Sequence, residues 1–493
     1  MRWKIITILV LALMLLISPA VSSTMFTTSG SDTDYDPLVD IEVTVEIQAI
    51  RYLEEQEPES KALTLSQLLF NKLFDIQTTT STMPNLYVKV FINDQEFTSQ
   101  TYQSSNQVYN PDWSATANVP DEQEIVNIKI QLYDVAGSGM LLDLSGDTGS
   151  SNDGYDAEIE YNIKTGHWTG DDSLEDPSGY GRLCGCDDGT ILEDDRDSEL
   201  WFNIYQNDYD QDTIPYWTEV NEYSTDPEQK NSGDPDNDLI PVEWEYNWGY
   251  NPFSWDDHEE LDPDQDSLNN SEEYLTSAWY SDPYRKDVYI EMDMMEEGPN
   301  GEKTVFPVNA GELIKNAFNR RNIIYHLDMG EMGGFEMIPF DSDIGRGDLE
   351  NIYFNYFLHG DESNWRRGVF RYGLVVYDEM PQGYMFRTNG YQIATVGIEE
   401  KAASPFTGDR DIAYGSAYMH ELGHIFAFNP IPGHNQDSKH PWQPGFWINR
   451  PYRSCMNYGW MYQFVDYSDG SRRDPDINDW ARIDFYAFEH EWH

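Results

Sequence analysis

Cysteine is scarce in this chain of 493 residues, which has three, two of them (Cys184 and Cys186) separated by one glycine. Small exported proteins without a large core rely on several disulfides, and three thiols cannot form such a framework. We therefore expect packed side chains, and bound metal, to stabilise the fold. The length of the chain predicts two or three domains.

Basic residues are also few: lysine and arginine number 30 against 89 aspartates and glutamates, for a formal net charge of −59. This charge argues against nucleic acid or an anionic membrane surface as a partner. Apolar residues make up 39% of the chain, so the acidity alone does not indicate disorder. Two interpretations of the acid stay open, namely calcium coordination and a surface adapted to a salt-rich habitat.

Long apolar runs are confined to the N-terminus. Arg2 and Lys4 precede an apolar run over residues 5–17, and the small residues of "SPAVSS" follow it. The pattern predicts a signal peptide over residues 1–23, with an uncleaved anchor as the alternative. We expect a secreted protein, extracellular or at the cell surface, with no membrane insertion after signal cleavage.

Residues 24–200 have the pattern of a β-sandwich. "IEVTVEIQAI", "NLYVKVFINDQEF" and "VNIKIQLYDV" alternate apolar and polar residues, as half-buried strands do. With "YNPDWSA" as a turn between strands, the segment resembles a C2-like domain. Such domains often bind calcium through loop aspartates, and the resemblance makes Asp134, Asp143 and Asp147 candidates.

Residues 201–284 contain an internal repeat. "DYDQDTIPYWTE", "DPDNDLIPVEWE" and "DPDQDSLNNSEE" each place aspartates at positions one, three and five and an acid at position twelve. A loop of this spacing can wrap a calcium ion in oxygen ligands and close with a bidentate glutamate. The predicted calcium ligands are Asp208, Asp210, Asp212, Glu219, Asp234, Asp236, Asp238, Glu245, Asp262, Asp264, Asp266 and Glu273.

The three copies are similar to EF-hand loops and to the calcium repeats of thrombospondin type 3. They depart from the EF-hand pattern at position six, where glycine is usual and Thr213, Leu239 and Ser267 stand instead. The alternative is a solvated acidic linker. We expect calcium to act structurally, by turning mutually repelling carboxylates into a stiff spacer.

Residues 285–493 mix strand and helix signals. "KDVYIEMDMM", "IIYHLDMG", "RYGLVVYDEM" and "YQIATVGIEE" read as strands, and "VNAGELIKNAFNRR" reads as an amphipathic helix. The mixture predicts an α+β domain, a sheet with helices packed on it. The whole chain is thus predicted to be multidomain.

The stretch "YMHELGHIFAFNPIPGHN" carries the chemistry of this last domain. His420 and His424 are four residues apart, so on a helix they share a face and can bind one ion. Glu421 lies beside them and can act as general base toward a metal-bound water. Paired helical histidines can also be merely structural.

A second motif, "RSCMNYGW", begins some thirty residues later. The two motifs together resemble the metzincin family of zinc metallopeptidases, in which a methionine turn underlies the zinc. The resemblance makes Met456 that methionine, and it makes Tyr458 a candidate for oxyanion stabilisation. Packing beneath the site is the other role open to Tyr458.

The third zinc ligand departs from the extended motif H-E-x-x-H-x-x-G-x-x-H. Ala427 replaces its glycine, and Pro430 stands where the last histidine belongs. The turn formers of "NPIPG" permit a longer turn that returns His434 to the metal. His440 and Asp437 are alternatives, and so is a site with two histidines alone.

These features predict a hydrolase, a secreted zinc metalloprotease that cuts polypeptide substrates by metal-activated water, with Glu421 as base and calcium as stabiliser. An extended substrate would pair with the strand "YQIATVGIEE". The alternative function is a calcium-dependent adhesion protein with a degenerate, inactive peptidase domain. Cys184 or Cys186 as a latent thiolate ligand of the zinc is a further option, against a plain loop thiol pair or local disulfide.

Overall fold

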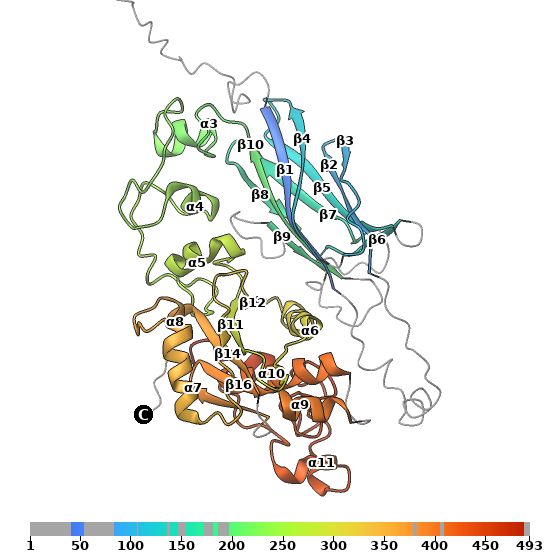
Figure 1. Ribbon diagram of the computed structural model, residues 1–493. Coiled ribbons are helices and arrows are strands. Elements are labelled where there is room, and N and C mark those ends of the chain that lie inside the picture. The colour runs from blue at the N-terminus through green and yellow to red at the C-terminus, as the bar shows by residue number, and fades with distance from the viewer. Residues whose placement is uncertain are drawn as a thin grey trace, which may run out of the picture.

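A computed structural model describes residues 41–53, 83–105, 107–135, 139–145, 154–171, 181–185, 197–377, 382–404 and 409–487. The signal peptide predicted over residues 1–23 lies outside these ranges. Among the described residues no helix is both long and apolar enough to cross a membrane. In Figure 1 the N-terminal sheets, a helical spacer and a C-terminal sheet with helices follow one another along the chain.

Two antiparallel sheets form the N-terminal β-sandwich. One sheet has the order β4-β1-β10-β9 and the other β3-β2-β5-β7-β8, with β6 beside β5. The strands are β1 (Ile41–Tyr52), β2 (Leu86–Ile92), β3 (Gln95–Thr98), β4 (Gln107–Val119), β5 (Ile125–Asp134), β6 (Met140–Leu142), β7 (Ala157–Asn162), β8 (His167–Gly170), β9 (Gly181–Cys184) and β10 (Ser198–Gln206). Their alternate apolar residues fill one core between the sheets.

The prediction of a turn at "YNPDWSA" is wrong. The stretch lies inside the continuous strand β4, where the register against β1 shifts between Ile47 and Ala49. Asn110 and Asp112 have positive φ at this irregularity, as residues in a β-bulge often do. A bulge absorbs turn-forming residues without ending the strand, which is why local sequence misleads here.

The three repeats form a chain of short helices beside the sandwich (Figure 1). These are α3 (Tyr216–Thr218) with η3 (Glu219–Tyr223), α4 (Val242–Asn247), and α5 (Asn270–Thr276) with η4 (Ser277–Trp279). Thr218 Oγ1 donates to the Lys164 carbonyl (3.0 Å), and the His167 ring contacts the Tyr246 carbonyl at 3.0 Å. The first two repeats are therefore packed against the sandwich.

A mixed sheet of order β12-β11-β14-β16-β15 forms the C-terminal part, with β13 beside β11. The strands β11 (Asp287–Met295), β12 (Ile324–Asp328), β13 (Met337–Ile338), β14 (Phe370–Val376) and β16 (Gly390–Ala394) run parallel, and β15 (Gly383–Arg387) is the antiparallel edge. The strands β11, β12, β14 and β16 are buried at nearly every position, as parallel strands covered on both faces are, and β11 includes the buried acids Glu291 and Asp293.

Helices cover both faces of this sheet. On one face lie α6 (Val308–Asn319) and α10 (Arg410–Ile425), which share a core with β11, β14 and β16. On the other face lie α7 (Arg346–Ile352), η5 (Tyr353–Phe357) and α8 (Arg366–Val369). The shorter elements are α9 (Thr395–Ala402), η6 (Gln436–Ser438), α11 (Pro444–Ile448) and η7 (Trp480–Arg482).

One strand prediction in this region needs correction. "YQIATVGIEE" is a strand only as far as Ala394, and α9 begins at Thr395. The strand β16 is also interior, because β15 covers its outer side. At this end of the sheet the terminal strand is therefore β15.

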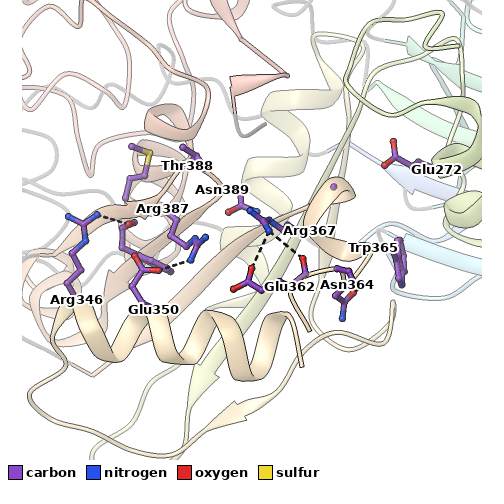
Figure 2. A pocket seen from close by; sticks show the side chains of 14 residues that line it. Glu272, Arg346, Glu350, Glu362, Asn364, Trp365, Arg367, Arg387, Thr388 and Asn389 are labelled. Atoms are coloured by element: carbon purple, nitrogen blue, oxygen red, sulfur yellow. Dashed lines mark hydrogen bonds and ion pairs between the residues drawn. The ribbon is translucent and has the colours of Figure 1, made fainter. Parts of the chain in front are cut away.

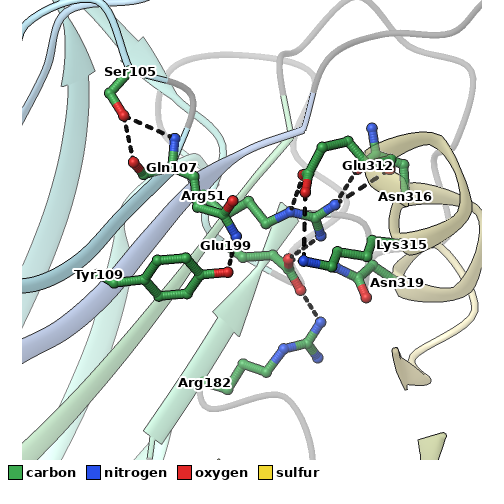
Figure 3. Close-up of polar contacts among 10 residues, drawn as sticks. All are labelled: Arg51, Ser105, Gln107, Tyr109, Arg182, Glu199, Glu312, Lys315, Asn316 and Asn319. Atoms are coloured by element: carbon green, nitrogen blue, oxygen red, sulfur yellow. Dashed lines mark hydrogen bonds and ion pairs between the residues drawn. The ribbon is translucent and has the colours of Figure 1, made fainter. Parts of the chain in front are cut away.

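A buried charge network joins the sandwich to the C-terminal part (Figure 3). Arg51 on β1 contacts Glu199 on β10 at 3.0 Å and Glu312 on α6 at 3.4 Å. Arg182 also pairs with Glu199, and Asn319 Nδ2 donates to Glu199 Oε2 (2.5 Å). Because Glu199 is fully buried, this contact fixes the sandwich against α6, which itself packs on α10.

Candidate metal centre

The helix α10 carries the His-Glu-x-x-His motif. It begins after Asp409, whose side chain accepts the Ile412 N–H (2.9 Å) and caps the first turn. The predicted apolar stripe is buried in the shared core, with Tyr414, Tyr418 and Leu422 all fully covered. Burial of this stripe fixes the orientation of the helix, and the orientation of the helix determines where the histidine side chains point.

Three imidazoles converge beside the last turns of α10, two from the helix and one from the segment that follows it. The ligand atoms of His420, His424 and His434 all lie within 4.8 Å of one another. The Nε2 atoms of His420 and His434 are 3.2 Å apart. Tetrahedral zinc with bonds of 2.0–2.1 Å holds its nitrogens about 3.3 Å apart, so this spacing fits the ion.

The protonation of His420 also suits a metal. Its Nδ1–H donates to the Cys455 carbonyl (2.9 Å), which leaves the Nε2 lone pair toward the other histidines. Burial lowers the pKa of His420 well below its usual range and that of His424 to about 4, with neighbouring histidines adding to both. Neutral imidazole is the form that ligates zinc.

The turn after α10 returns the chain to the cluster. Ala427 stands at the glycine position of the extended motif and has a φ of 57°. Gly433 also has positive φ, and its carbonyl accepts the Tyr458 N–H (3.3 Å). This link holds His434 against the predicted methionine turn. A side chain at Gly433 would strike Asn457, so glycine is required there on two counts.

Met456 is fully buried beneath the helix. A Cβ added at Gly423 would collide with its sulfur and lie 3.0 Å from its Cε. Gly423 therefore lets Met456 approach α10 between the two histidines of the motif. The methionine therefore packs under the part of the helix that carries the histidines.

Glu421 is 4% exposed, and burial raises its pKa to about 8. Gly383, the first residue of edge strand β15, lies directly against it, since a Cβ at Gly383 would meet the Glu421 carboxylate. The base candidate and the terminal strand of the sheet are therefore neighbours. Sequence reasoning missed this glycine, because the pattern around "GYMFR" is too short and irregular to mark a strand.

Tyr458 lies beside the histidines. Its ring centroid is 4.4 Å from that of His434 and 5.7 Å from that of His420. Burial raises its pKa, and the Glu421 charge raises it further. Tyr462 is a second buried phenol affected by Glu421, and its hydroxyl has no hydrogen-bond partner among the described residues. The Met-turn motif pointed to Tyr458, but no motif pointed to Tyr462.

The other candidates for the third position lie elsewhere. His440 is exposed and stacks on Trp442, with centroids 4.4 Å apart. Asp437 is exposed, and its Oδ2 accepts the Gly445 N–H (3.2 Å). Cys184 is buried in β9 against Leu53, and Cys186 lies outside the described residues. Of these candidates, His434 is the one the fold brings to the histidine pair.

The three Asp-rich loops share one backbone conformation. In each loop positions four and six have positive φ of 64–83°, and the position-six N–H donates to the first aspartate at 3.0–3.1 Å. The N–H of position seven donates to the fifth-position aspartate, Asp212, Asp238 or Asp266. The absence of glycine at position six therefore does not prevent the sharp turn.

The same loops gather carboxylates whose oxygens lack partners. The groups within 4.8 Å are Asp210, Asp212 and Glu219; Asp234, Asp236 and Asp238; and Asp262, Asp264 and Asp266. Among the described residues, both side-chain oxygens of Asp210, Asp236, Glu245 and Glu273 are buried without hydrogen bonds. Burial and neighbouring carboxylates raise the pKa of Asp210 to about 6 and that of Glu219 to about 7. Buried, unpaired carboxylates of this kind fit a hard cation.

The sandwich aspartates have local roles. Asp134 Oδ1 accepts the Asn85 N–H (2.9 Å) at the end of β5. Asp143 is buried, and its Oδ1 accepts the Ser145 N–H (2.9 Å). Asp147 lies outside the described residues. A calcium role for these three stays a prediction.

A separate cavity of about 900 Å³ lies by α7, α8 and the β15–β16 turn (Figure 2). Its arginines are committed to neighbours: Arg387 to Glu350 (2.8 Å), Arg367 to Glu362 (3.2 Å), and Arg346 to the Phe386 carbonyl (3.1 Å). Arg387 and Arg367 are thus paired with carboxylates, whereas the contact of Arg346 is to a neutral carbonyl. The residues that line the cavity do not include the histidine cluster.

No protein-family model and no curated protein matches this chain. Among solved structures, human GIVD cytosolic phospholipase A2 aligns with 34% of this chain at 10% identity and a TM-score of 0.18, over 18% of its own length. A C2 domain of plant Extended Synaptotagmin 1 aligns with 33% at 10% identity and 0.17, over 92% of its length. A further C2 domain aligns with 33% at 9% identity and 0.17, over 97% of its length. The likeness to C2 domains is distant and partial.

Proposed function

We propose that this protein is an exported zinc endopeptidase stabilised by calcium. The observation that carries the proposal is the convergence of His420, His424 and His434 within 4.8 Å, with Glu421 on the same helix as the first two. Three histidine ligands leave a fourth zinc position open, as catalytic sites require. The metzincin resemblance of the two motifs points to the same activity.

Each residue of the centre has its own role in the proposed reaction. The three histidines would hold the zinc, which when bound would lower the pKa of a water and polarise the scissile carbonyl. Glu421 accepts the proton of the attacking water and returns it to the leaving amine. Tyr458 stands beside His434 and donates a hydrogen bond from its hydroxyl to the developing oxyanion.

The substrate class is an extended polypeptide. Edge strand β15 begins at Gly383, against Glu421. A peptide that adds to this edge in β fashion would have its backbone held by main-chain hydrogen bonds beside the base. The main chain of the peptide would thereby be held beside Glu421.

The rival function, a calcium-dependent adhesion protein with an inactive domain, depended on Ala427 and Pro430 breaking the motif. The position of His434, 3.2 Å from His420, favours the peptidase. The orphaned carboxylates of the three loops support structural calcium in either function.

The test measures zinc content and casein proteolysis of the purified protein in calcium and high salt, with Glu421→Gln alongside. We expect zinc in both forms and activity in the parent alone, with a loss of at least about 10²–10⁴-fold in the variant. If the parent binds zinc but has no proteolytic activity, the proposed function changes from a peptidase to a zinc-binding protein. A parent that binds no zinc at the histidines would overturn the proposal outright.

A further inference from the structure

His258 is a buried histidine that faces the second Asp-rich loop. It lies between α4 and α5 in the chain, and its side chain is fully buried. Its Nε2 is 3.2 Å from Asp238 Oδ2 and 3.6 Å from Glu245 Oε1, which are positions five and twelve of that loop. The three ligand atoms all lie within 4.8 Å of one another.

Most of the atoms at this meeting point lack a hydrogen bond. Among the described residues, His258 Nε2, both oxygens of Glu245 and both oxygens of Asp236 are buried without a hydrogen-bond partner. Asp238 Oδ2 accepts the Asp256 N–H at 3.3 Å. A cation among an imidazole nitrogen and carboxylates at this separation would compensate their burial. The imidazole nitrogen comes from outside the Asp-rich loop and adds a buried nitrogen to the oxygens of the acidic cluster.

In the first repeat an asparagine, and not a histidine, lies between the carboxylates of positions five and twelve. There the Asn231 backbone N–H donates to Asp212 Oδ2 (2.8 Å), and Asn231 Nδ2 donates to Glu219 Oε1 (2.8 Å). A donor amide thus bridges positions five and twelve and satisfies both. In the second repeat an imidazole that makes no such hydrogen bond stands at this bridge. The difference separates the second loop chemically from the first.

The surroundings hold the ring in place. Nδ1 of His258 lies 3.0 Å from Nδ2 of Asn270, the first residue of α5. An asparagine amide can turn over to present its oxygen at the same position, and the Nδ1–H of the ring then donates to that oxygen and leaves the lone pair on Nε2. The rings of Trp244 and Tyr250 contact the imidazole edge-on, with centroids 6.0 and 5.0 Å away. A polar partner on the distal nitrogen is the usual support of a metal-ligating histidine.

We propose that the second repeat and His258 form a mixed nitrogen–oxygen site for a transition-type divalent cation such as zinc. Asp238, Glu245 and His258 provide the ligands, with Asp236 beside them. Imidazole together with carboxylates favours zinc or cobalt, whereas calcium prefers oxygen ligands alone. The protein would then carry a second zinc, outside the histidine cluster of α10.

The experiment counts metals on the full-length protein in excess calcium, so that oxygen-only sites fill with calcium. Zinc is added in small steps and measured by elemental analysis of the washed protein. We expect two zinc ions per parent chain, one in His258→Gln, and one in His420→Ala/His424→Ala. Asn270→Ala should weaken the second zinc about 10–100-fold. The matched control is His326→Gln, another buried histidine that contacts a carboxylate, Asp287, at 2.5 Å; it should keep both ions.

Equal zinc in the parent and in His258→Gln would overturn the inference. A single zinc that survives in His420→Ala/His424→Ala and disappears in His258→Gln would support it while removing the proposed catalytic centre, so the two failures differ. Because His258→Gln can impair folding, X-ray absorption of the zinc-loaded His420→Ala/His424→Ala protein is the second measurement. One imidazole with carboxylate oxygens around the zinc is the expected result. An oxygen-only shell, or no bound zinc, would also overturn the inference.

Discussion

The Nε2 atoms of His420 and His434 lie 3.2 Å apart across a turn that is longer than the extended metzincin motif allows. The turn uses left-handed backbone at Ala427 and Gly433, so the spacing in sequence changes while the third imidazole still reaches the other two. The candidate centre therefore depends on the fold of this turn more than on the motif's letters.

The first prediction concerns this third ligand. His434→Ala should lower zinc affinity at the α10 centre more than about 100-fold, because removal of a ligand exceeds the 10–100-fold effect of an outer-shell change. The measurement is zinc competition with a chelator. His440→Ala, which removes an exposed histidine of the same segment, is the matched control and should leave affinity unchanged. Unchanged zinc affinity in His434→Ala would instead favour Asp437 as the third ligand, or a site with two histidines alone.

The second prediction concerns the contact between Gly383 and Glu421. Gly383→Ala places a Cβ against the Glu421 carboxylate and moves the base. A displacement of about 1 Å can cost about 10²-fold in rate, so kcat should fall by that order while zinc content stays the same. Gly347→Ala in α7 is the control, since a Cβ there meets nothing within 4 Å. If both variants keep full activity, β15 does not define the cleft.

Local pattern predicted most of the elements and much of the candidate centre. The alternation in "IEVTVEIQAI" and the helical stripe around His420 are properties of neighbouring residues, and both elements lie where they were expected. The bulge at Asn110 and the edge strand at Gly383 were missed. Each depends on which strand pairs alongside, and that information is not local.

The contact between Arg51 and Glu312 shows the same limit more strongly. These residues are 261 positions apart, and nothing near either one in the sequence marks it as a partner of the other. The sequence likewise did not predict that the three loops share one backbone conformation, because glycine is the usual residue at position six and is absent from all three. Hydrogen bonds from that position to the first aspartate stabilise the left-handed turn in all three.

The third prediction concerns pH in the absence of calcium. The folded-state pKa of Asp210 is raised to about 6 and that of Glu219 to about 7, chiefly by burial. The folded form then binds more protons than the unfolded form, so stability falls as pH rises from the unfolded values near 4 through these raised values. Calcium-free protein should resist proteolysis in the spacer better at pH 5 than at pH 8.

Calcium should reverse this trend, because it binds the ionised carboxylates and is displaced by protons. Limited proteolysis at both pH values, with calcium and with a chelator, is the measurement. Equal resistance in all four conditions would mean that the loops are solvated acidic segments without a bound ion.

The last prediction concerns the charge network between sandwich and α6. Glu199 is fully buried between Arg51 and Arg182, and Asn319 of α6 donates to it. Glu199→Gln removes the negative charge that Arg51 and Arg182 share, while Arg51 keeps its contact with Glu312. Loss of one partner of a buried ion pair costs about 3–5 kcal/mol in the free energy of unfolding. Denaturant unfolding followed by fluorescence and by activity is the measurement.

Glu297→Gln breaks the exposed pair with Lys303 and is the control, at no more than about 1 kcal/mol. Because Glu199 joins elements of the sandwich to the helix that packs on α10, Glu199→Gln should lose activity and sandwich structure together. If the sandwich unfolds at a denaturant concentration at which the proposed peptidase activity is retained, the two parts are stable independently.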